Sequence, residues 1–408
     1  LFLVSAIEKE GNKLDFVFSP AEEKLRLEAS KFVREEWEDR GKDVTSLWVA
    51  SHDVDDVEER ERIHEFTQKL IEKGWWTMHW PKRYGGQDAP FSTLLAYRET
   101  MAYEGAPESL GGGIEAPTLM LHGTEWQKDF FLPKISNGEI TRWSQGFSEP
   151  DAGSDLASIE TRAVEDGDDY IINGQKIWNS DGAWSDWGHY LVRTDPNSPK
   201  HRGISYLLLD MKSPGVKILP IYDGLGRRRW SQIFLEDVRV PKQNLLGEAN
   251  RGFYVAMTTL SFERIPVEVP ARLLRYLERF IGEYTKGKLK HLQNNAAAKH
   301  ILADLRVQIE TARMIMYRGA WLQGQGSVPE SEASMTKAML DETGIRVYKE
   351  LARLAGADAL YRPRTNQKAP MHGLLGANAW LSTAFSLGGG SLEVQRQIIA
   401  QRGLALPR

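Results

Sequence analysis

The first third of the chain spaces its apolar residues with a helical period. Ser19-Pro20-Ala21-Glu22 matches a capping box with proline at the first helical position, and an apolar stripe follows it. A second stripe predicts a helix over 54–73 that Gly74 stops, and a third helix is predicted over 91–103. The pattern therefore predicts a helical region from about residue 19 to residue 139.

The middle of the chain changes to the shorter period of strands, with glycine and proline between the runs. Asn173-Gly174 lies between two such runs and predicts a hairpin, because a type I′ turn needs positive φ at both central residues. The runs together predict a small antiparallel β-domain. Its predicted strands cover 160–165, 170–173, 175–179, 189–193, 204–209, 216–220 and 232–238.

The helical period returns at about Gly252 and continues almost to the end of the chain. The order is helices, then strands, then helices, so the predicted fold is mainly α with a central β-domain. A chain of 408 residues is also longer than one hydrophobic core usually serves. We predict three domains, over 1–141, 142–250 and 251–408.

Composition removes several classes of function. The absence of cysteine excludes disulfides, thiolate zinc sites and a thiol nucleophile, and the nine histidines are scattered without a metal-binding spacing, so no metal is expected. A net charge of −4 does not favour binding to nucleic acid. No run approaches the roughly 20 apolar residues of a membrane span. The apolar opening 1–4 is too short for a secretory signal, and a cytoplasmic location is expected.

Three motifs carry the candidate chemistry. Residues 143–155 read Trp-Ser-Gln-Gly-Phe-Ser-Glu-Pro-Asp-Ala-Gly-Ser-Asp, which puts small residues and hydroxyls where a backbone can approach a flat or phosphorylated ligand. Taken alone, this stretch reads as a polar loop that enters a β-domain. Residues 170–182 read Tyr-Ile-Ile-Asn-Gly-Gln-Lys-Ile-Trp-Asn-Ser-Asp-Gly, and residues 390–396 read Gly-Ser-Leu-Glu-Val-Gln-Arg. No Gly-x-Gly-x-x-Gly dinucleotide fingerprint accompanies them.

In this order the motifs resemble those of the acyl-CoA dehydrogenase family, the flavoenzymes of fatty-acid and related β-oxidation. The family loop is matched over 148–155 and its hairpin over 170–182, with Ser180 in place of threonine and Asp181 in place of asparagine. Residues 123–128 and 395–408 also match. The resemblance covers about 16–408. It implies an N-terminal helical domain, a small antiparallel β-barrel or sandwich, and a C-terminal four-helix bundle.

The resemblance also implies FAD as the cofactor and an acyl-CoA as the substrate. Serine hydroxyls at 148 and 180 are expected to donate hydrogen bonds to the flavin ring, and Trp178 offers it an aromatic face. The residues expected to bind FAD are Gln145, Phe147, Ser148, Gly153, Ser154, Trp178, Ser180 and Ser391. Those expected to touch the acyl-CoA are Ser154, Ser261, Arg264 and Gly390.

The general base departs from the commonest pattern of the family. The reaction needs a carboxylate that takes a proton from the α-carbon of the thioester while hydride leaves the β-carbon. Many relatives carry this glutamate just before the glycine of the C-terminal motif, where this chain has Gly389. Other relatives carry it on the first helix after the β-domain, where this chain has Glu263-Arg264. Glu263 is therefore the predicted base.

By the same resemblance, relatives with the base on this helix often take bulky acyl groups, so a branched, alicyclic or steroid-like acyl-CoA is expected. An electron-transfer flavoprotein is the expected electron acceptor, and the chain is expected to form a homotetramer or homodimer. Residues 279–295 match the adenine-end pattern of relatives only loosely, which leaves room for a heteromer. Two alternatives stay open: a non-catalytic or half-site subunit, and an acyl-CoA oxidase that uses dioxygen.

Overall fold

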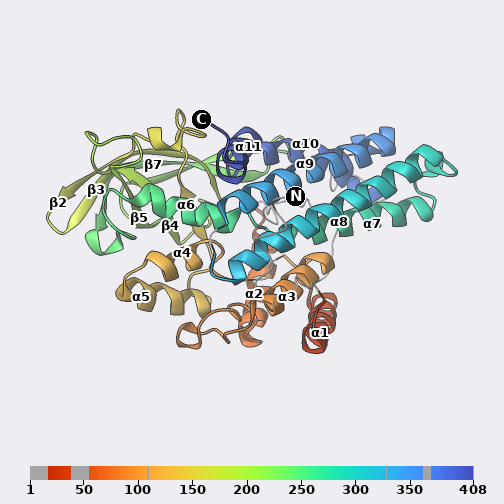
Figure 1. Ribbon diagram of the computed structural model, residues 1–408, viewed down its shortest axis with the longest axis horizontal. Helices are drawn as coiled ribbons and strands as arrows, with labels where there is room; N and C mark the ends of the chain where they lie inside the picture. Colours follow the sequence, from red (N-terminus) through yellow and green to blue (C-terminus); the bar gives the residue numbers. More distant parts are fainter. Residues whose placement is uncertain (1–16, 38–54, 108–109, 328, 362–368, 408) are drawn as a thin grey trace.

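The computed structural model describes residues 17–37, 55–107, 110–327, 329–361 and 369–407. Helices, strands and helices follow one another as predicted, and Figure 1 shows the sheet at one end with the C-terminal helices running away from it. Among the described helices, none is both long and apolar enough to cross a bilayer. The opening run 1–4, the predicted helix start at 54 and Arg408 lie outside the described residues.

The predicted capping box begins the first helix. The Glu22 amide donates to Ser19 Oγ at 3.3 Å and the Ser19 amide donates to a Glu22 carboxylate oxygen at 2.7 Å, so two orphan amides of the helix terminus are satisfied. The second predicted helix ends before Gly74, which has φ +67°. The helices are α1 Pro20–Glu36, α2 Val57–Glu72, α3 Phe91–Glu104, α4 Glu115–His122 and α5 Glu125–Ser136.

The central region forms one seven-stranded sheet in the order β1-β4-β2-β3-β7-β6, with β5 paired to β4. Most neighbours are antiparallel, as predicted, but β4 runs parallel to β1 and, over one residue pair, to β2. The strands are β1 Trp143–Gly146, β2 Arg162–Asp166, β3 Asp169–Ser180, β4 Trp187–Arg193, β5 Ile204–Asp210, β6 Val216–Tyr222 and β7 Arg228–Pro241. The sequence pattern had not predicted β1.

The hairpin predicted at Asn173-Gly174 is wrong. Strand β3 continues through both residues, and the turn from β2 into β3 lies instead at Asp166–Asp169, where Gly167 has φ +60°. Gly174 is needed for another reason: a Cβ atom there would lie 2.6 Å from Thr161 Oγ1 and 2.7 Å from Thr161 Cα. The glycine therefore marks a bulge and a close backbone approach rather than a turn.

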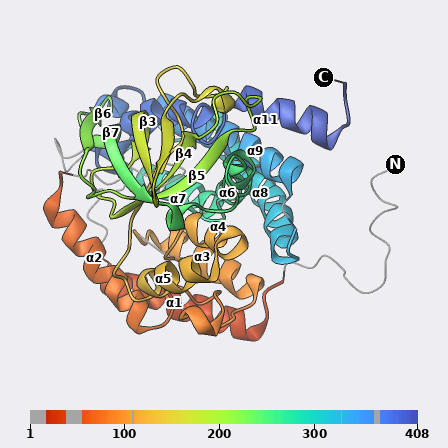
Figure 2. The same ribbon diagram turned by 90° about the vertical axis from the view of Figure 1, so that its left-hand side faces the viewer.

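The C-terminal helices pack around a long apolar core. Their bounds are α6 Gly252–Glu263, α7 Val269–Thr285, α8 Ala296–Gly324, α9 Glu330–Ala355, α10 Leu374–Leu381 and α11 Leu392–Ile398. A second core joins all three regions, since Phe131 of α5, Tyr206 of β5 and Leu260 of α6 belong to it. Figure 2 shows the N-terminal helices beneath the sheet and α4 beside α6. This shared core holds the end of α6 against the sheet.

Candidate active site

The first two motifs are joined by hydrogen bonds to two backbone carbonyls of the first motif. The Ile177 amide donates to Ser148 O at 2.9 Å, and Asn179 Nδ2 donates to Gln145 O at 2.8 Å. The end of β1 and the loop after it are thus fixed against the second half of β3. The structure therefore brings residues 145–148 and 178–180 to one place.

A buried ion pair fastens the same two motifs. Lys176 Nζ lies 2.7 Å from Glu149 Oε1, and the two side chains are 0% and 8% exposed. Burial lowers the pKa of Lys176 to about 8, against the opposing effect of Glu149. Burial acts to raise the pKa of Glu149, but Lys176 and the amides of Glu160 and Thr161 outweigh it and lower this pKa. Neither residue was predicted as part of the site, although both lie in the motifs.

Trp178 presents an open aromatic face in an unusual backbone conformation. Its φ is +64°, its side chain is 56% exposed, and it meets Trp230 edge-on at 5.9 Å between ring centres. A positive φ is costly for a bulky residue and persists only where the surroundings impose it. The strand is irregular here, between Lys176 and Asn179, and this irregularity turns the indole outward.

The other β-domain residues predicted to bind FAD differ in how far they are exposed. Gln145 and Ser148 are partly buried beside β3, whereas Ser154 and Ser180 are exposed and nothing lies within 4 Å of a Cβ added to Gly153. Phe147 is different, because its ring is 4% exposed and packs against His189 and Tyr206. The side chain of Phe147 is therefore not available to a ligand in this loop.

The two alternative positions of the base converge in space. A Cβ atom added to Gly389 would lie 3.3 Å from Glu263 Oε1 and 3.1 Å from Lys337 Cε. Glu263, the last residue of α6, thus puts its carboxylate beside the position that carries the glutamate in many relatives. Its Oε2 atom is buried and accepts no hydrogen bond from the residues that the structure describes. Sequence spacing alone had not shown that the two positions are neighbours.

Burial and charge act on Glu263 in opposite directions. Burial raises the pKa of this carboxyl, while Arg264, Lys337 and a hydrogen bond from Gln145 lower it. Burial also lowers the pKa of Arg264, which Glu263 and Glu330 oppose. The result is a desolvated carboxylate with cations nearby, an arrangement suited to proton abstraction.

The glycine turn before α11 is held by one glutamine. Gln395 Nε2 donates to Gly390 O at 2.9 Å and to Gly389 O at 3.3 Å, and both glycines have positive φ. Ser391 caps α11 by accepting from the Val394 amide. Gly390 approaches the guanidinium of Arg264, whose Nη2 atom would lie 3.6 Å from an added Cβ. The glycine turn therefore lies against one side of the Glu263 carboxylate.

The remaining predicted substrate residue uses its side chain locally. Ser261 is 2% exposed, and its Oγ donates to Met257 O at 2.8 Å within α6. Its carbonyl accepts from Gln323 of α8. The structure thus brings Glu263, Arg264, Gly389 and Gly390 together, while Ser261 supports the helix that carries them.

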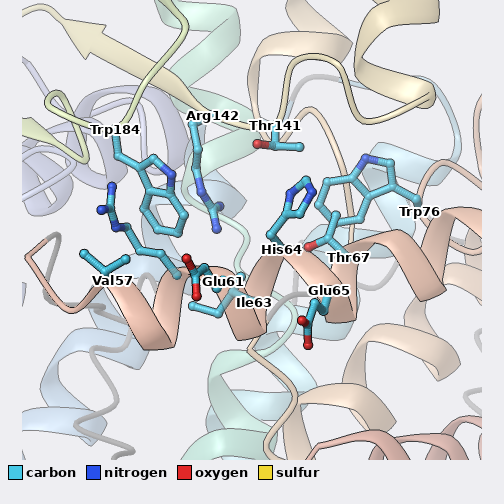
Figure 3. Close-up of a pocket in the computed structure, with 11 residues that line it drawn as sticks. Val57, Glu61, Ile63, His64, Glu65, Thr67, Trp76, Thr141, Arg142 and Trp184 are labelled. Carbon is cyan, nitrogen blue, oxygen red and sulfur yellow. The ribbon is translucent and has the colours of Figure 1, made fainter.

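A cavity of about 400 Å³ lies between α2 and the start of the sheet (Figure 3). The guanidiniums of Arg60 and Arg142 lie 5.7 and 4.5 Å from the ring centre of Trp184 in its wall. None of its lining residues is among those predicted for the site. This cavity is therefore separate from the Glu263 environment.

Family models match almost the whole chain in three consecutive parts. The acyl-CoA dehydrogenase N-terminal domain matches residues 19–139, the middle domain residues 144–238 and the C-terminal domain residues 250–404. The chain belongs to the acyl-CoA dehydrogenase family. Its members are oxidoreductases and flavoproteins that in general depend on FAD, so the predicted family, fold class and enzyme class are confirmed.

Individual acyl-CoA dehydrogenases resemble the chain over nearly its full length. Acyl-CoA dehydrogenase FadE26 of Mycobacterium tuberculosis is 33% identical over 96% of this chain and 98% of its own. The solved Tcur3481-Tcur3483 steroid ACAD has a TM-score of 0.85 at 30% identity and covers 97% of this chain and 100% of its own. The ChsE4-ChsE5 complex from Mycobacterium tuberculosis has a TM-score of 0.80 at 31% identity, with coverage of 97% and 100%.

Proposed function

We propose that this member of the family removes hydrogen from the α- and β-carbons of a bulky acyl-CoA thioester, with Glu263 as the general base. The observation that carries the proposal is the position of the Glu263 carboxylate beside Gly389. A chain without a proton acceptor at residue 389 has one within contact distance of the same point. The site therefore retains the group that the chemistry requires.

Glu263 has the properties of a base that acts away from water. Its free Oε2 atom is buried, so it can accept the α-proton without first losing a hydrogen bond. Arg264, Lys337 and Gln145 favour its charged form against the effect of burial. Glu263 takes the proton at this oxygen and holds it while the double bond forms.

The residues of the two β-domain motifs fit a flavin. Trp178 supplies the exposed aromatic face, Ser148 and Ser180 the hydroxyls, and the loop at Gly153 has open space around its backbone. FAD, when bound, supplies the acceptor for the hydride that leaves the β-carbon. The Glu149–Lys176 pair holds the two motifs in register for this ligand.

The proposed substrate class rests on the position of the base and on a similar protein. Glu263 supplies the carboxylate beside residue 389, and the turn at 388–390 adds no side chain of its own next to it. Ser154 and Arg264 are the groups that we assign to the anionic CoA moiety. A similar protein of known structure is named a steroid acyl-CoA dehydrogenase. A branched, alicyclic or steroid-like thioester is the substrate class that we propose.

Anaerobic flavin reduction tests the base directly. Glu263→Gln should lower the rate of flavin bleaching by a panel of bulky acyl-CoAs about 10²–10⁴-fold, because a positioned general base contributes that much. Glu125→Gln, a change of an exposed glutamate on α5, should leave the rate unchanged. Bleaching at the wild-type rate in Glu263→Gln would overturn the assignment.

The second candidate function is that of a half-site subunit, whose flavin site is complete only together with another chain. One similar structure is a complex of two named proteins. We expect the chain expressed alone to retain FAD and to pass electrons to an electron-transfer flavoprotein. FAD measured in the purified chain, before and after co-expression with candidate partner chains, decides between the two. Retention only with a second polypeptide would favour the half-site subunit. Re-oxidation by dioxygen at the rate of turnover would favour the oxidase.

A further inference from the structure

A second glutamate in the region of the proposed base is largely buried, with its side chain 13% exposed. Glu115 begins α4, which packs against α6: Thr118 Oγ1 lies 3.1 Å from Thr259 Oγ1, and His122 Nε2 lies 3.0 Å from Thr258 Oγ1. Figures 1 and 2 show the two helices side by side. Because these contacts pair the end of α4 with the middle of α6, the start of α4 lies towards the end of α6, where Glu263 is.

The two carboxyl groups act on each other and on a common neighbour. The charge of Glu263 contributes, after burial, to raising the pKa of Glu115 to about 7. Burial raises the pKa of Tyr206, and both glutamates add to this effect, so this phenol stays neutral between them. A chain of contacts links the two acids: Glu115 Oε1 lies 3.7 Å from His189 Nδ1, His189 Nε2 lies 3.2 Å from Gln145 Oε1, and the Gln145 side chain is hydrogen-bonded to Glu263. Acids coupled in a desolvated site titrate as a pair rather than independently.

Glu263 and Glu115 differ in the charged groups that surround them. Arg264, Lys337 and Gln145 favour the charged form of Glu263, with Lys337 itself paired to Asp341. Glu115 lies instead 3.7 Å from His189 Nδ1, and burial lowers the pKa of this histidine to about 3, so the imidazole is neutral. The groups that favour a charge on Glu115 are the backbone amides of Ile114 and of Glu115 itself.

We propose that Glu115 and Glu263 form an acid–carboxylate pair that carries one negative charge, held on Glu263, while Glu115 keeps the proton. Glu115 is then a positioning residue, because it acts on the reaction through the charge state of Glu263. The inference deepens the proposed function and rests on Glu263 as the base. It predicts a second ionisation in the site, that of Glu115, near neutral pH.

Infrared spectroscopy of the holoenzyme detects the proton on Glu115 without turnover. We expect the signal of a buried carboxylic acid to disappear with a midpoint near pH 7 in the wild type and to be absent in Glu115→Gln. In Glu263→Gln the midpoint should shift to lower pH, because the neighbouring charge is gone. Glu125→Gln, which changes the exposed first residue of α5, should leave the signal and its midpoint unchanged.

The rate of flavin reduction provides the second readout. The wild type should show a bend near pH 7 in its pH profile that Glu115→Gln lacks, whereas a purely structural role of Glu115 would leave the shape of the profile unchanged. A carboxylic acid signal that survives Glu115→Gln and vanishes in Glu263→Gln would overturn the proposal by placing the proton on Glu263. Full activity of Glu263→Gln together with the expected shift of the infrared midpoint would instead contradict the proposed function and leave the charge pair standing.

Discussion

At the scale of single residues, Lys176 shows how a motif can be explained by its contacts. Its ammonium reaches Glu149 Oε1 at 2.7 Å and Phe147 O at 3.2 Å, so one buried charge supports the whole turn of the loop. Removing one partner of such a pair leaves the other charge uncompensated in a low dielectric. The lysine is therefore needed for structure before any ligand binds.

Lys176→Met should destabilise the protein by about 3–5 kcal/mol, because Glu149 would stay buried without its cation. Denaturant titration of the purified protein measures this loss, and retained FAD measures the expected weakening of the loop. Lys200→Met removes the exposed Lys200–Asp155 contact on the same loop. That control should change stability by less than about 1 kcal/mol, and equal losses in the two variants would contradict the explanation.

At the scale of elements, β3 shows why a turn signal can mislead. Asn173-Gly174 suits a type I′ turn locally, yet both residues lie inside a strand of 12 residues that pairs with β2 on one side and β7 on the other. Pairing along the whole strand gives hydrogen-bond partners to more backbone N–H and C=O groups than a turn there would. The glycine is retained because the Thr161 backbone passes too close for a side chain.

Gly174→Ala should destabilise the sheet by about 1–3 kcal/mol, since the new methyl group would overlap Thr161. Gly282→Ala is the matched control: it lies within α7, and nothing is within 4 Å of its added Cβ. Alanine there should stabilise the protein by about 0.5–1 kcal/mol. Thermal denaturation of both variants measures these changes in stability. Unchanged stability of Gly174→Ala would show that the strand can shift to make room for the methyl group.

At the scale of the whole molecule, a partly buried ion pair joins the N-terminal helices to the C-terminal bundle. Glu99 of α3 is 4% exposed and accepts hydrogen bonds from Arg313 and Tyr317 of α8. The pKa of Arg313 is raised because these bonds and the charge of Glu99 outweigh burial. The pair therefore fixes the position of α3 against the bundle from which α6 and Glu263 extend.

Glu99→Ala should cost about 1.5–3 kcal/mol, because Arg313, whose side chain is 25% exposed, would lose its hydrogen bonds to a charged partner. Faster hydrogen exchange in both α3 and α8, together with a lower melting temperature, would show that the two parts have loosened. Glu310→Ala removes a 3.3 Å contact with the same arginine, from a side chain that is 34% exposed. We expect at most about 1 kcal/mol there, and exchange confined to α3 in Glu99→Ala would argue against an anchoring role.

Periodicity and short motifs were enough to predict the order of helices, strands and helices, the capping box at Ser19, and the family, because they report local burial and local backbone geometry. The family resemblance also predicted Glu263 as the base, although only as a position on a helix. The strand that contains Trp143 was missed because it is only four residues long and its neighbour β4 is distant in the sequence.

Which residues meet depends on how the chain packs in three dimensions. The tertiary structure placed Glu263 beside Gly389, joined Glu149 to Lys176, and brought Glu115 to the same site from a helix about 150 residues earlier in the chain. These relations depend on how separate segments pack and on the loss of water around charged groups, which no local pattern encodes. The chemistry that we propose therefore follows from residues named by the sequence and from neighbours chosen by the fold.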